Sequence, residues 1–410
     1  MSDGAERPLP YGRHAVDDDD VAAVARTLRG DWLTGGPAVA GFEAALTRVT
    51  GASHAIACAS GTAALHLAAL ALDLGPGDAV VVPTLTFLAT ANAPRHAGAE
   101  IAFADVDPDT GLMGVAELEA ALARAEAEGT GRVRAAFPVH LNGQCADPAG
   151  LAAACDARGL AVVADAAHAF ATRYAAGGAE RAVGADADAL LTAFSFHPVK
   201  VIAMGEGGAV TTGSAALAER LTRLRTHGIA RDAGAFRNRD LAFDSGGAAN
   251  PWYYEMAEPG LNYRASDIHC ALALSQLAKL DRFVARRAAL VARYDALLAP
   301  LAPAVRPVAR APGCRPAWHL YVVHIDFAGL GIERAEVMRR LRGERILTQV
   351  HYTPVHLQPY YRDRYGALDL PGAEAYYRRA LSLPLFPAMA DDDVVRVVAA
   401  LGHVLGLGRT

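Results

Sequence analysis

Between residues 54 and 212 the chain alternates short apolar runs with helical stretches, and this alternation limits the fold more than any other feature. The apolar runs predict seven strands, at His54–Ala59, Ala79–Pro83, Glu100–Ala104, Val133–Val139, Leu160–Ala164, Ala189–Phe196 and Gly208–Thr212. Helices such as Ala63–Leu72, Val115–Glu128 and Asp147–Arg158 lie between most of them. Strands that are apolar throughout belong in a sheet buried on both faces. We therefore predict an α/β fold with a mainly parallel seven-stranded sheet covered by helices on both faces.

The second half of the chain has a different pattern. It predicts helices at Ser266–Val284, Arg286–Leu298, Arg334–Arg345 and Asp391–Leu405, a half-buried strand at His319–Phe327 and a further strand at Leu347–Tyr352. Because 410 residues exceed what one core usually holds, we expect a second, smaller α+β domain. The predicted division is an N-terminal arm and helix (1–30), a large domain (31–250), a loop and connecting helix (251–284) and the small C-terminal domain (285–410).

Charge and cysteine content exclude several classes of protein. The 39 basic and 44 acidic residues form no basic block, so a nucleic-acid partner is not expected. The uncharged stretch Ala55–Leu72 contains Ser60, Thr62 and His66, whose polar groups argue against a membrane span. The N-terminus lacks the apolar region of a signal peptide. Five scattered cysteines without a CxxC pair indicate no disulfide framework and suit a reducing cytoplasm.

Ligands of a parallel sheet bind at the carboxyl ends of its strands, where three segments have chemically useful residues. Ser60-Gly61-Thr62 joins the first strand to a helix, whose N-terminus can bind a phosphate, although for this segment taken alone capping by Ser60 or Thr62 is the more common explanation. Asp165 ends the fifth strand, with His168 three residues later; either is also common as a turn or core residue.

The strongest local feature is Ser195-Phe196-His197-Pro198-Val199-Lys200 followed by Gly205-Glu206-Gly207-Gly208. A lysine in an apolar, Gly-flanked loop of an arginine-rich chain indicates amine chemistry, because a desolvated lysine is a nucleophile. A phosphate cradle, a strand-end Asp and this lysine together fit pyridoxal 5′-phosphate (PLP). Lys200 would hold its aldehyde, Asp165 its ring nitrogen and Ser195 its phosphate. Phe87 would stack on the ring, unless it only packs.

These segments, together with Gly30-Asp31-Trp32-Leu33-Thr34, Pro138-Val139-His140 and Asp165-Ala166-Ala167-His168-Ala169, carry a resemblance over nearly the whole chain. The sequence resembles the DegT/DnrJ/StrS-type nucleotide-sugar aminotransferases, which have the PLP-dependent transferase fold type I. The resemblance implies the roles above for Lys200, Asp165, Ser195 and Phe87, and phosphate contacts from Ser60, Gly61 and Thr62. It also implies that His168 bonds the phenolic oxygen of PLP, and that Asn262 reaches the phosphate of a neighbouring subunit in a homodimer with shared active sites.

Within this family the segments Pro251–Met256, Asn262–Arg264 and Gln349–Tyr361 look most like the UDP-4-amino-4,6-dideoxy-N-acetyl-β-L-altrosamine transaminases of pseudaminic acid synthesis. The resemblance implies a nucleotide-sugar substrate, with glutamate as amino donor, and the substrate-contacting residues Tyr11, Arg13, Trp32, Thr34, His140, His351, Tyr352 and His356. Three positions depart from the family pattern. Gly35 replaces a Gln, Leu141-Asn142 replaces Phe-Ala, and Ala164 replaces an acidic residue.

Other interpretations remain open at this stage. GDP- or dTDP-linked sugars and the gluco epimer would suit the same chemistry, since no residue selects the nucleotide. A sugar dehydratase on this scaffold would have His in place of Lys200, and a non-catalytic regulator would not need Lys200, Asp165 and Ser195 together. Among 14 histidines, only His351 and His356 are close enough to suggest a metal, and no Cys or carboxylate shares their spacing, so no metal is predicted.

Overall fold

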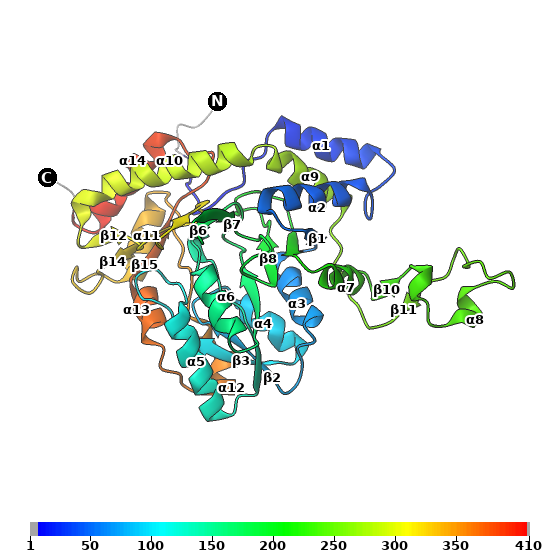
Figure 1. The fold of residues 1–410 in the computed structure, drawn as a ribbon. Helices are drawn as coiled ribbons and strands as arrows, with labels where there is room; N and C mark the ends of the chain where they lie inside the picture. The colour runs from blue at the N-terminus through cyan, green and yellow to red at the C-terminus, as the bar shows by residue number, and fades with distance from the viewer. Residues whose placement is uncertain (1–6, 408–410) are drawn as a thin grey trace.

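A seven-stranded sheet forms the centre of the protein (Figure 1). The computed structural model describes residues 7–407; residues 1–6 and 408–410, the ends of the predicted arm and C-terminal domain, lie outside the described residues. The strand order is β1-β9-β8-β5-β4-β2-β3. The bounds are β1 His54–Cys58, β2 Asp78–Pro83, β3 Glu100–Ala104, β4 Arg132–Ala136, β5 Ala161–Asp165, β8 Leu191–Ser195 and β9 Gly208–Thr212. All seven predicted strands are present, and only β9 is antiparallel to its neighbours, which confirms the fold class.

Helices cover both faces of this sheet because successive strand residues point to opposite sides. In β2, Val80 and Val82 belong to one apolar cluster that also includes residues of α3 (Gly61–Ala71), α4 (Leu88–Ala97) and α7 (Ala215–Arg225). Val81, between them, packs on the other side with α5 (Val115–Glu128) and α6 (Pro148–Asp156). The helices α1 (Asp18–Arg29), α2 (Pro37–Thr50) and α9 (Asp267–Leu277) pack together beside β1.

The C-terminal part has its own three-stranded sheet, β12-β14-β15, with bounds Val305–Pro307, Tyr321–Ile325 and Ala380–Leu383. The other elements here are α10 Leu280–Leu298, α11 Arg334–Gly343, α12 Pro359–Tyr365, α13 Pro371–Arg379 and α14 Asp391–Val404. The prediction that strand 319–327 is half-buried was wrong. Val323 packs in the C-terminal core, whereas Val322 packs with residues of the large sheet, so β14 is buried on both faces.

Two further predictions for this half were wrong. The expected helix break at residue 285 lies instead at 278–279, between α9 and α10, where the Lys279 amide bonds the carbonyl of Gln276 and not that of residue 275. The expected strand Leu347–Tyr352 is absent. The Leu347 amide bonds the Leu9 carbonyl, whereas Gln349 pairs with Ser382, so no continuous ladder forms.

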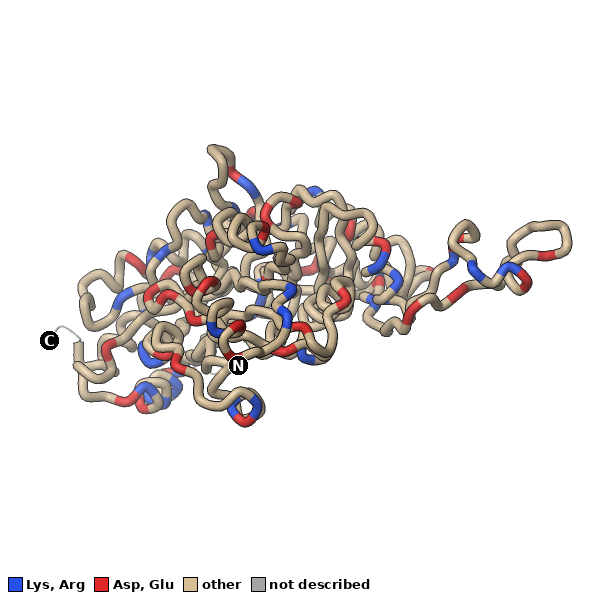
Figure 2. The backbone as a smooth tube through the Cα atoms, turned by 60° about the horizontal axis from the view of Figure 1, so that its bottom comes forward, with Lys and Arg blue, Asp and Glu red and all other residues tan. Residues whose placement is uncertain are grey.

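Small elements that the sequence did not predict extend from this body. One is the arm of residues 229–256, which holds β10 (Ile229–Ala230), α8 (Arg239–Ala242) and β11 (Glu255–Met256) and projects far from the sheet (Figures 1 and 2). The others are a second sheet, β13-β6-β7 (Cys314–Arg315, Arg173–Ala176, Ala179–Ala182), and single turns at Leu141–Gly143, Ala233–Ala235, Ala299–Leu301 and Val355–Leu357. Within residues 7–407 no helix is long and apolar enough to cross a membrane.

Candidate active site

A cavity of about 660 Å³ opens beside the end of β5 and the start of α3. Eleven of the residues singled out from the sequence line it: Tyr11, Ser60, Gly61, Thr62, Phe87, Asp165, His168, Ser195, Lys200, His351 and Tyr352. They come from segments up to 341 residues apart. The parallel sheet brings most of them to one edge, as expected for a ligand that binds at the carboxyl ends of the strands. The volume suits a cofactor together with a small substrate.

The start of α3 forms an anion cradle. Ser60 caps the helix, since its Oγ accepts a hydrogen bond of 3.1 Å from the Ala63 amide. The first amides of a helix lack acceptors within the helix and point at the space beyond it, where they bind phosphate. Ser195, at the end of β8, closes the cradle so tightly that a Cβ on Gly61 would lie 2.7 Å from its Cβ. The capping and phosphate interpretations of Ser60 are therefore compatible.

Asp165 is a buried carboxylate, with 4% of its surface exposed. Its Oδ2 accepts a 2.7 Å hydrogen bond from Thr90, and its Oδ1 accepts one of 3.0 Å from the Ala167 amide. Burial raises the pKa of Asp165 nevertheless, while these hydrogen bonds and the nearby Lys200 lower it. A cationic ring nitrogen would offset that cost, so the site fits PLP. Sequence reasoning missed Thr90, because its partner is 75 residues away.

Lys200 follows β8 and is one of only two lysines in the chain. Burial lowers the pKa of its amine from 10.5 to about 8, and the charge of Asp165 opposes this shift. Near neutral pH a much larger fraction of this amine is therefore uncharged, and so nucleophilic, than of an ordinary lysine. Its Nζ lies 3.5 Å from Nε2 of His319, which also lines the cavity.

His168 and His319 form a pair of buried imidazoles beside Lys200, with ring centroids 4.4 Å apart. His168 Nδ1 accepts the Asn142 amide at 3.3 Å, so the proton of the neutral ring is on Nε2, 3.0 Å from the Tyr352 hydroxyl. Burial lowers the pKa of both imidazoles. Sequence reasoning did not single out His319. The only signal was its place at the start of an alternating strand, which gave it a structural explanation.

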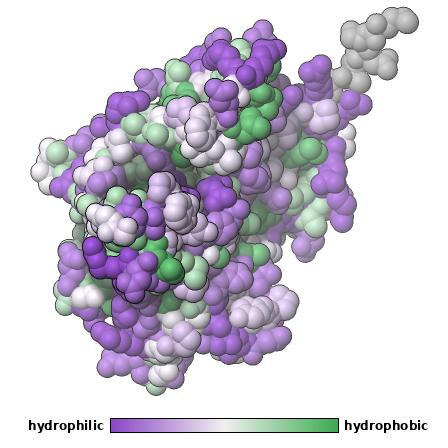
Figure 3. Space-filling view, turned by 90° about the vertical axis from the view of Figure 1, so that its right-hand side faces the viewer, coloured by the Kyte–Doolittle hydropathy of each residue, from purple (hydrophilic) through white to green (hydrophobic). Residues whose placement is uncertain are grey.

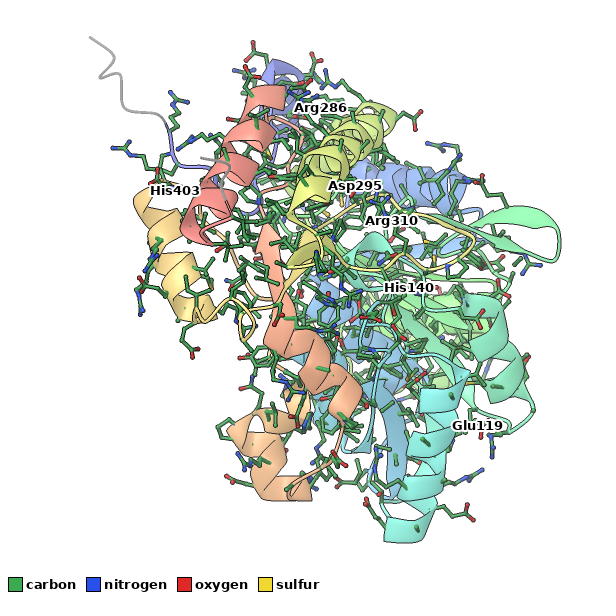
Figure 4. The ribbon with its side chains drawn as sticks, turned by 90° about the vertical axis from the view of Figure 1, so that its left-hand side faces the viewer. Glu119, His140, Arg286, Asp295, Arg310 and His403 are labelled. Carbon is green, nitrogen blue, oxygen red and sulfur yellow. The ribbon has the colours of Figure 1, made fainter. Side chains whose placement is uncertain are left out.

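Six other predicted site residues do not line the cavity. His140 is buried inside the body (Figure 4), where its Nδ1 accepts the Ala146 amide at 3.1 Å. His356 is also buried and bonds Thr84 at 2.7 Å. The other four, Arg13, Trp32, Thr34 and Asn262, are exposed. Among residues 7–407 no group of three or more His, Cys, Asp or Glu side chains could hold a metal ion.

The fold and this cavity are those of a PLP-dependent aminotransferase. Residues 14–402 match the DegT/DnrJ/EryC1/StrS aminotransferase family, and the chain belongs to it. Its cofactor is therefore PLP. The groups that would hold the aldehyde, ring nitrogen and phosphate are the Lys200 amine, the buried Asp165 carboxylate and the cradle at Ser60.

Three relatives show how far the likeness extends. The chain is 40% identical over 400 residues to the spore coat polysaccharide biosynthesis protein SpsC of Bacillus subtilis, covering 97% of each chain. Among solved structures, Helicobacter pylori PseC, an aminotransferase of pseudoaminic acid biosynthesis, is 25% identical with a TM-score of 0.85, covering 98% of this chain and all of that one. The PLP form of the putative sugar aminotransferase Spr1654 of Streptococcus pneumoniae is 26% identical, with a TM-score of 0.84 and coverage of 98% and 100%.

Proposed function

We propose that the enzyme aminates the C4 ketone of a UDP-linked 4-keto-6-deoxy-N-acetylhexosamine, forming UDP-4-amino-4,6-dideoxy-N-acetyl-β-L-altrosamine for pseudaminic acid. The observation that carries the transamination is that Lys200, whose pKa burial lowers to about 8, lines the same cavity as the buried Asp165 carboxylate. The likeness to PseC and the segments Pro251–Met256 and Gln349–Tyr361 support this particular sugar.

The reaction exchanges an amino group for a ketone oxygen. The donor, glutamate in this proposal, leaves as a 2-oxo acid and the sugar ketone becomes an amine, so no external oxidant is needed. PLP supplies the electron sink and carries the amino group between the two halves. Asp165 holds the ring nitrogen protonated, and the amine of Lys200 moves the proton between C4′ of the cofactor and C4 of the sugar as general base and acid.

Shared active sites in a homodimer complete the proposal. Large apolar side chains are exposed near the cavity and on the arm, including Trp32, Phe87 (54% exposed), Leu241, Trp252 (73%) and Met256. The face that the arm presents carries hydrophobic patches among hydrophilic ones (Figure 3). Exposed patches of this kind mark protein interfaces. A partner subunit seated there would supply Asn262 to the phosphate and would bring exposed residues such as Arg13 and Trp32 against the sugar nucleotide. Five free thiols suit a cytoplasmic enzyme.

A second candidate is the same amination on a different surface-polysaccharide sugar. The greater identity to SpsC, 40% against 25% for PseC, favours it. This candidate uses the same Lys200 and Asp165 chemistry and differs only in the sugar and nucleotide.

The reverse reaction separates the two candidates. The purified PLP form is mixed with 4-amino sugar nucleotides that differ in nucleotide (UDP, dTDP, GDP) and in epimer, and conversion of the cofactor to its amine form is followed by absorbance. We expect the UDP-linked altro sugar to react with a kcat/KM at least about tenfold above the others, the discrimination that 1.4 kcal/mol of transition-state binding gives.

A preference for another sugar would overturn the assignment of the altro sugar as substrate, but the protein would still be a sugar aminotransferase. No conversion with any amino sugar, although glutamate converts the cofactor, would overturn sugar amination. The Lys200→Ala variant is the blank for each reaction.

A further inference from the structure

Cys145 and Cys314 lie against each other, although 169 residues separate them in the chain. The backbone amide of Cys145 donates a hydrogen bond of 3.2 Å to Sγ of Cys314, and the two thiols also bond each other. A disulfide would form if the two sulfur atoms approached to the bonded distance of about 2.05 Å. The other cysteines, Cys58, Cys155 and Cys270, are completely buried.

The two thiols differ in the way that disulfide exchange requires. Cys314 is partly exposed on β13, and the hydrogen bonds from the thiol and amide of Cys145 lower the pKa of its thiol, against the effect of burial. Cys145 is buried, with 3% of its surface exposed, and its thiol proton is held by the bond to Cys314. A thiolate that is accessible attacks an oxidant first, and a neighbouring thiol resolves the product.

The segments that carry the two cysteines are fixed to each other on both sides of the contact. The Gln144 side chain accepts the Ala311 amide at 2.8 Å and donates to the Ala309 carbonyl at 3.1 Å. The Thr172 hydroxyl donates to the Gly143 carbonyl at 2.7 Å and accepts the Ala317 amide at 3.0 Å. These contacts hold the thiols together in the folded state, which raises their effective concentration.

The pair lies next to the cofactor cavity. Asn142, three residues before Cys145, donates its amide to His168 and accepts the His319 amide at 3.2 Å through its carbonyl. A covalent link between 145 and 314 would therefore join the loop that orients His168 to the segment that carries His319.

We propose that Cys145 and Cys314 are a redox-active dithiol, a covalent modification site that closes reversibly to a disulfide. With a low-molecular-weight disulfide such as oxidised glutathione as oxidant, the Cys314 thiolate attacks one glutathione sulfur and releases one reduced glutathione. Cys145 then attacks the Cys314 sulfur of the mixed disulfide and releases the second. The protein loses two electrons and two protons, and one oxidised glutathione becomes two reduced molecules.

The test treats the native holoenzyme with oxidised glutathione, then alkylates the remaining thiols in denaturant and maps the peptides by mass spectrometry. We expect the five thiols to fall to three, with a Cys145–Cys314 cross-linked peptide that dithiothreitol reopens. In Cys145→Ser the resolving thiol is absent, so glutathione should remain attached to Cys314. In Cys314→Ser neither a cross-link nor an adduct should form, because Cys145 is buried.

The matched control is Cys155→Ser, which removes a buried thiol without a role in the proposal and should cross-link as the wild type does. Five thiols remaining in the wild type, a cross-link through other cysteines, or a stable glutathione adduct on wild-type Cys314 would each overturn the proposal. If either serine variant fails to fold, the peptide map of the wild type still shows whether the Cys145–Cys314 cross-link forms.

Discussion

Lys200 and Asp165 stabilise each other's charge across a cavity that penalises both charges. Burial lowers the pKa of the lysine and raises that of the carboxylate, and each partner opposes the other's shift. The two groups therefore titrate as a pair. In the proposed site, the carboxylate would pair with the ring nitrogen of PLP, and the amine would be available for proton transfer.

The pKa of Lys200 can be measured because the chain has only one other lysine, Lys279, as an internal reference. Reductive methylation of the cofactor-free protein across pH should give a midpoint near pH 8 for Lys200 and one above 10.5 for Lys279, which Asp17 and Asp20 hold cationic. Asp165→Asn should lower the Lys200 midpoint further, because it removes the charge that raises it. The same variant should reduce kcat by about 100-fold, through loss of a charge-assisted hydrogen bond.

The lowered pKa of Lys200 also makes the free energy of unfolding depend on pH. Between about pH 8 and 10.5 the unfolded chain holds a proton on Lys200 that the folded chain has lost. The Lys200 contribution to the free energy of unfolding therefore rises with pH across this window. A Lys200 midpoint near 10.5 would contradict burial as the cause of a lowered pKa. A midpoint that rises in Asp165→Asn would contradict the opposing effect of the Asp165 charge.

At the scale of elements, the α3 N-terminus and the end of β8 form one candidate phosphate cradle, which depends on the absence of a side chain at Gly61. Gly61→Ala would place a Cβ 2.7 Å from that of Ser195 and force the two elements apart. Overpacking of this kind costs about 1–3 kcal/mol, so we expect PLP affinity to fall by about 5- to 100-fold with the fold retained. Equilibrium titration of the cofactor-free protein with PLP measures it.

Gly343→Ala is the matched control, because no atom lies within 4 Å of the Cβ it would add and its backbone is helical. It should bind PLP as the wild type does. Equal affinity in Gly61→Ala would show that the cradle is not closed by Ser195.

At the scale of the whole molecule, the proposed homodimer requires that one chain does not complete the site, and the arm and the exposed apolar surface are consistent with it. Asn262 is exposed and does not line its own chain's cavity, although the carbonyl of the next residue, Tyr263, accepts the Ala59 amide beside the phosphate cradle. Asn262 is thus next to a residue that contacts the cradle of its own chain, so whether it would serve its own subunit or the partner is a question for experiment.

Mixed dimers answer that question. Lys200→Ala and Asn262→Asp should each be inactive alone, the second because its charge repels the phosphate. When the two are unfolded together and refolded, random pairing makes half of the dimers mixed. If Asn262 serves the partner, each mixed dimer has one intact site and activity returns to about a quarter of wild type. If it serves its own chain, no activity returns.

The matched control pairs Lys200→Ala with Asp165→Asn, two residues that line one chain's cavity. Their mixed dimers have no intact site, so their activity should not exceed the residual activity of Asp165→Asn alone; a rise above that level would show that recovery does not require an intact site.

Local patterns were enough to predict much of this protein. Each strand of the central sheet is a continuous apolar run, and the candidate site residues Asp165, Lys200 and Ser60 follow such runs. Because ligands bind at the carboxyl ends of parallel strands, these residues could be located without knowledge of the packing. The motifs around them indicated the family.

Contacts between segments that are distant in the sequence could be found only from the tertiary structure. Thr90 reaches Asp165 from α4, His319 reaches Lys200 from the C-terminal part, and β14 is buried on its second face because the large sheet packs there. Cys145 and Cys314, scattered in the sequence, meet because β13 packs beside the loop after β4. Propensity and periodicity act over a few residues, whereas these partners are chosen by how whole layers pack, which no single segment encodes.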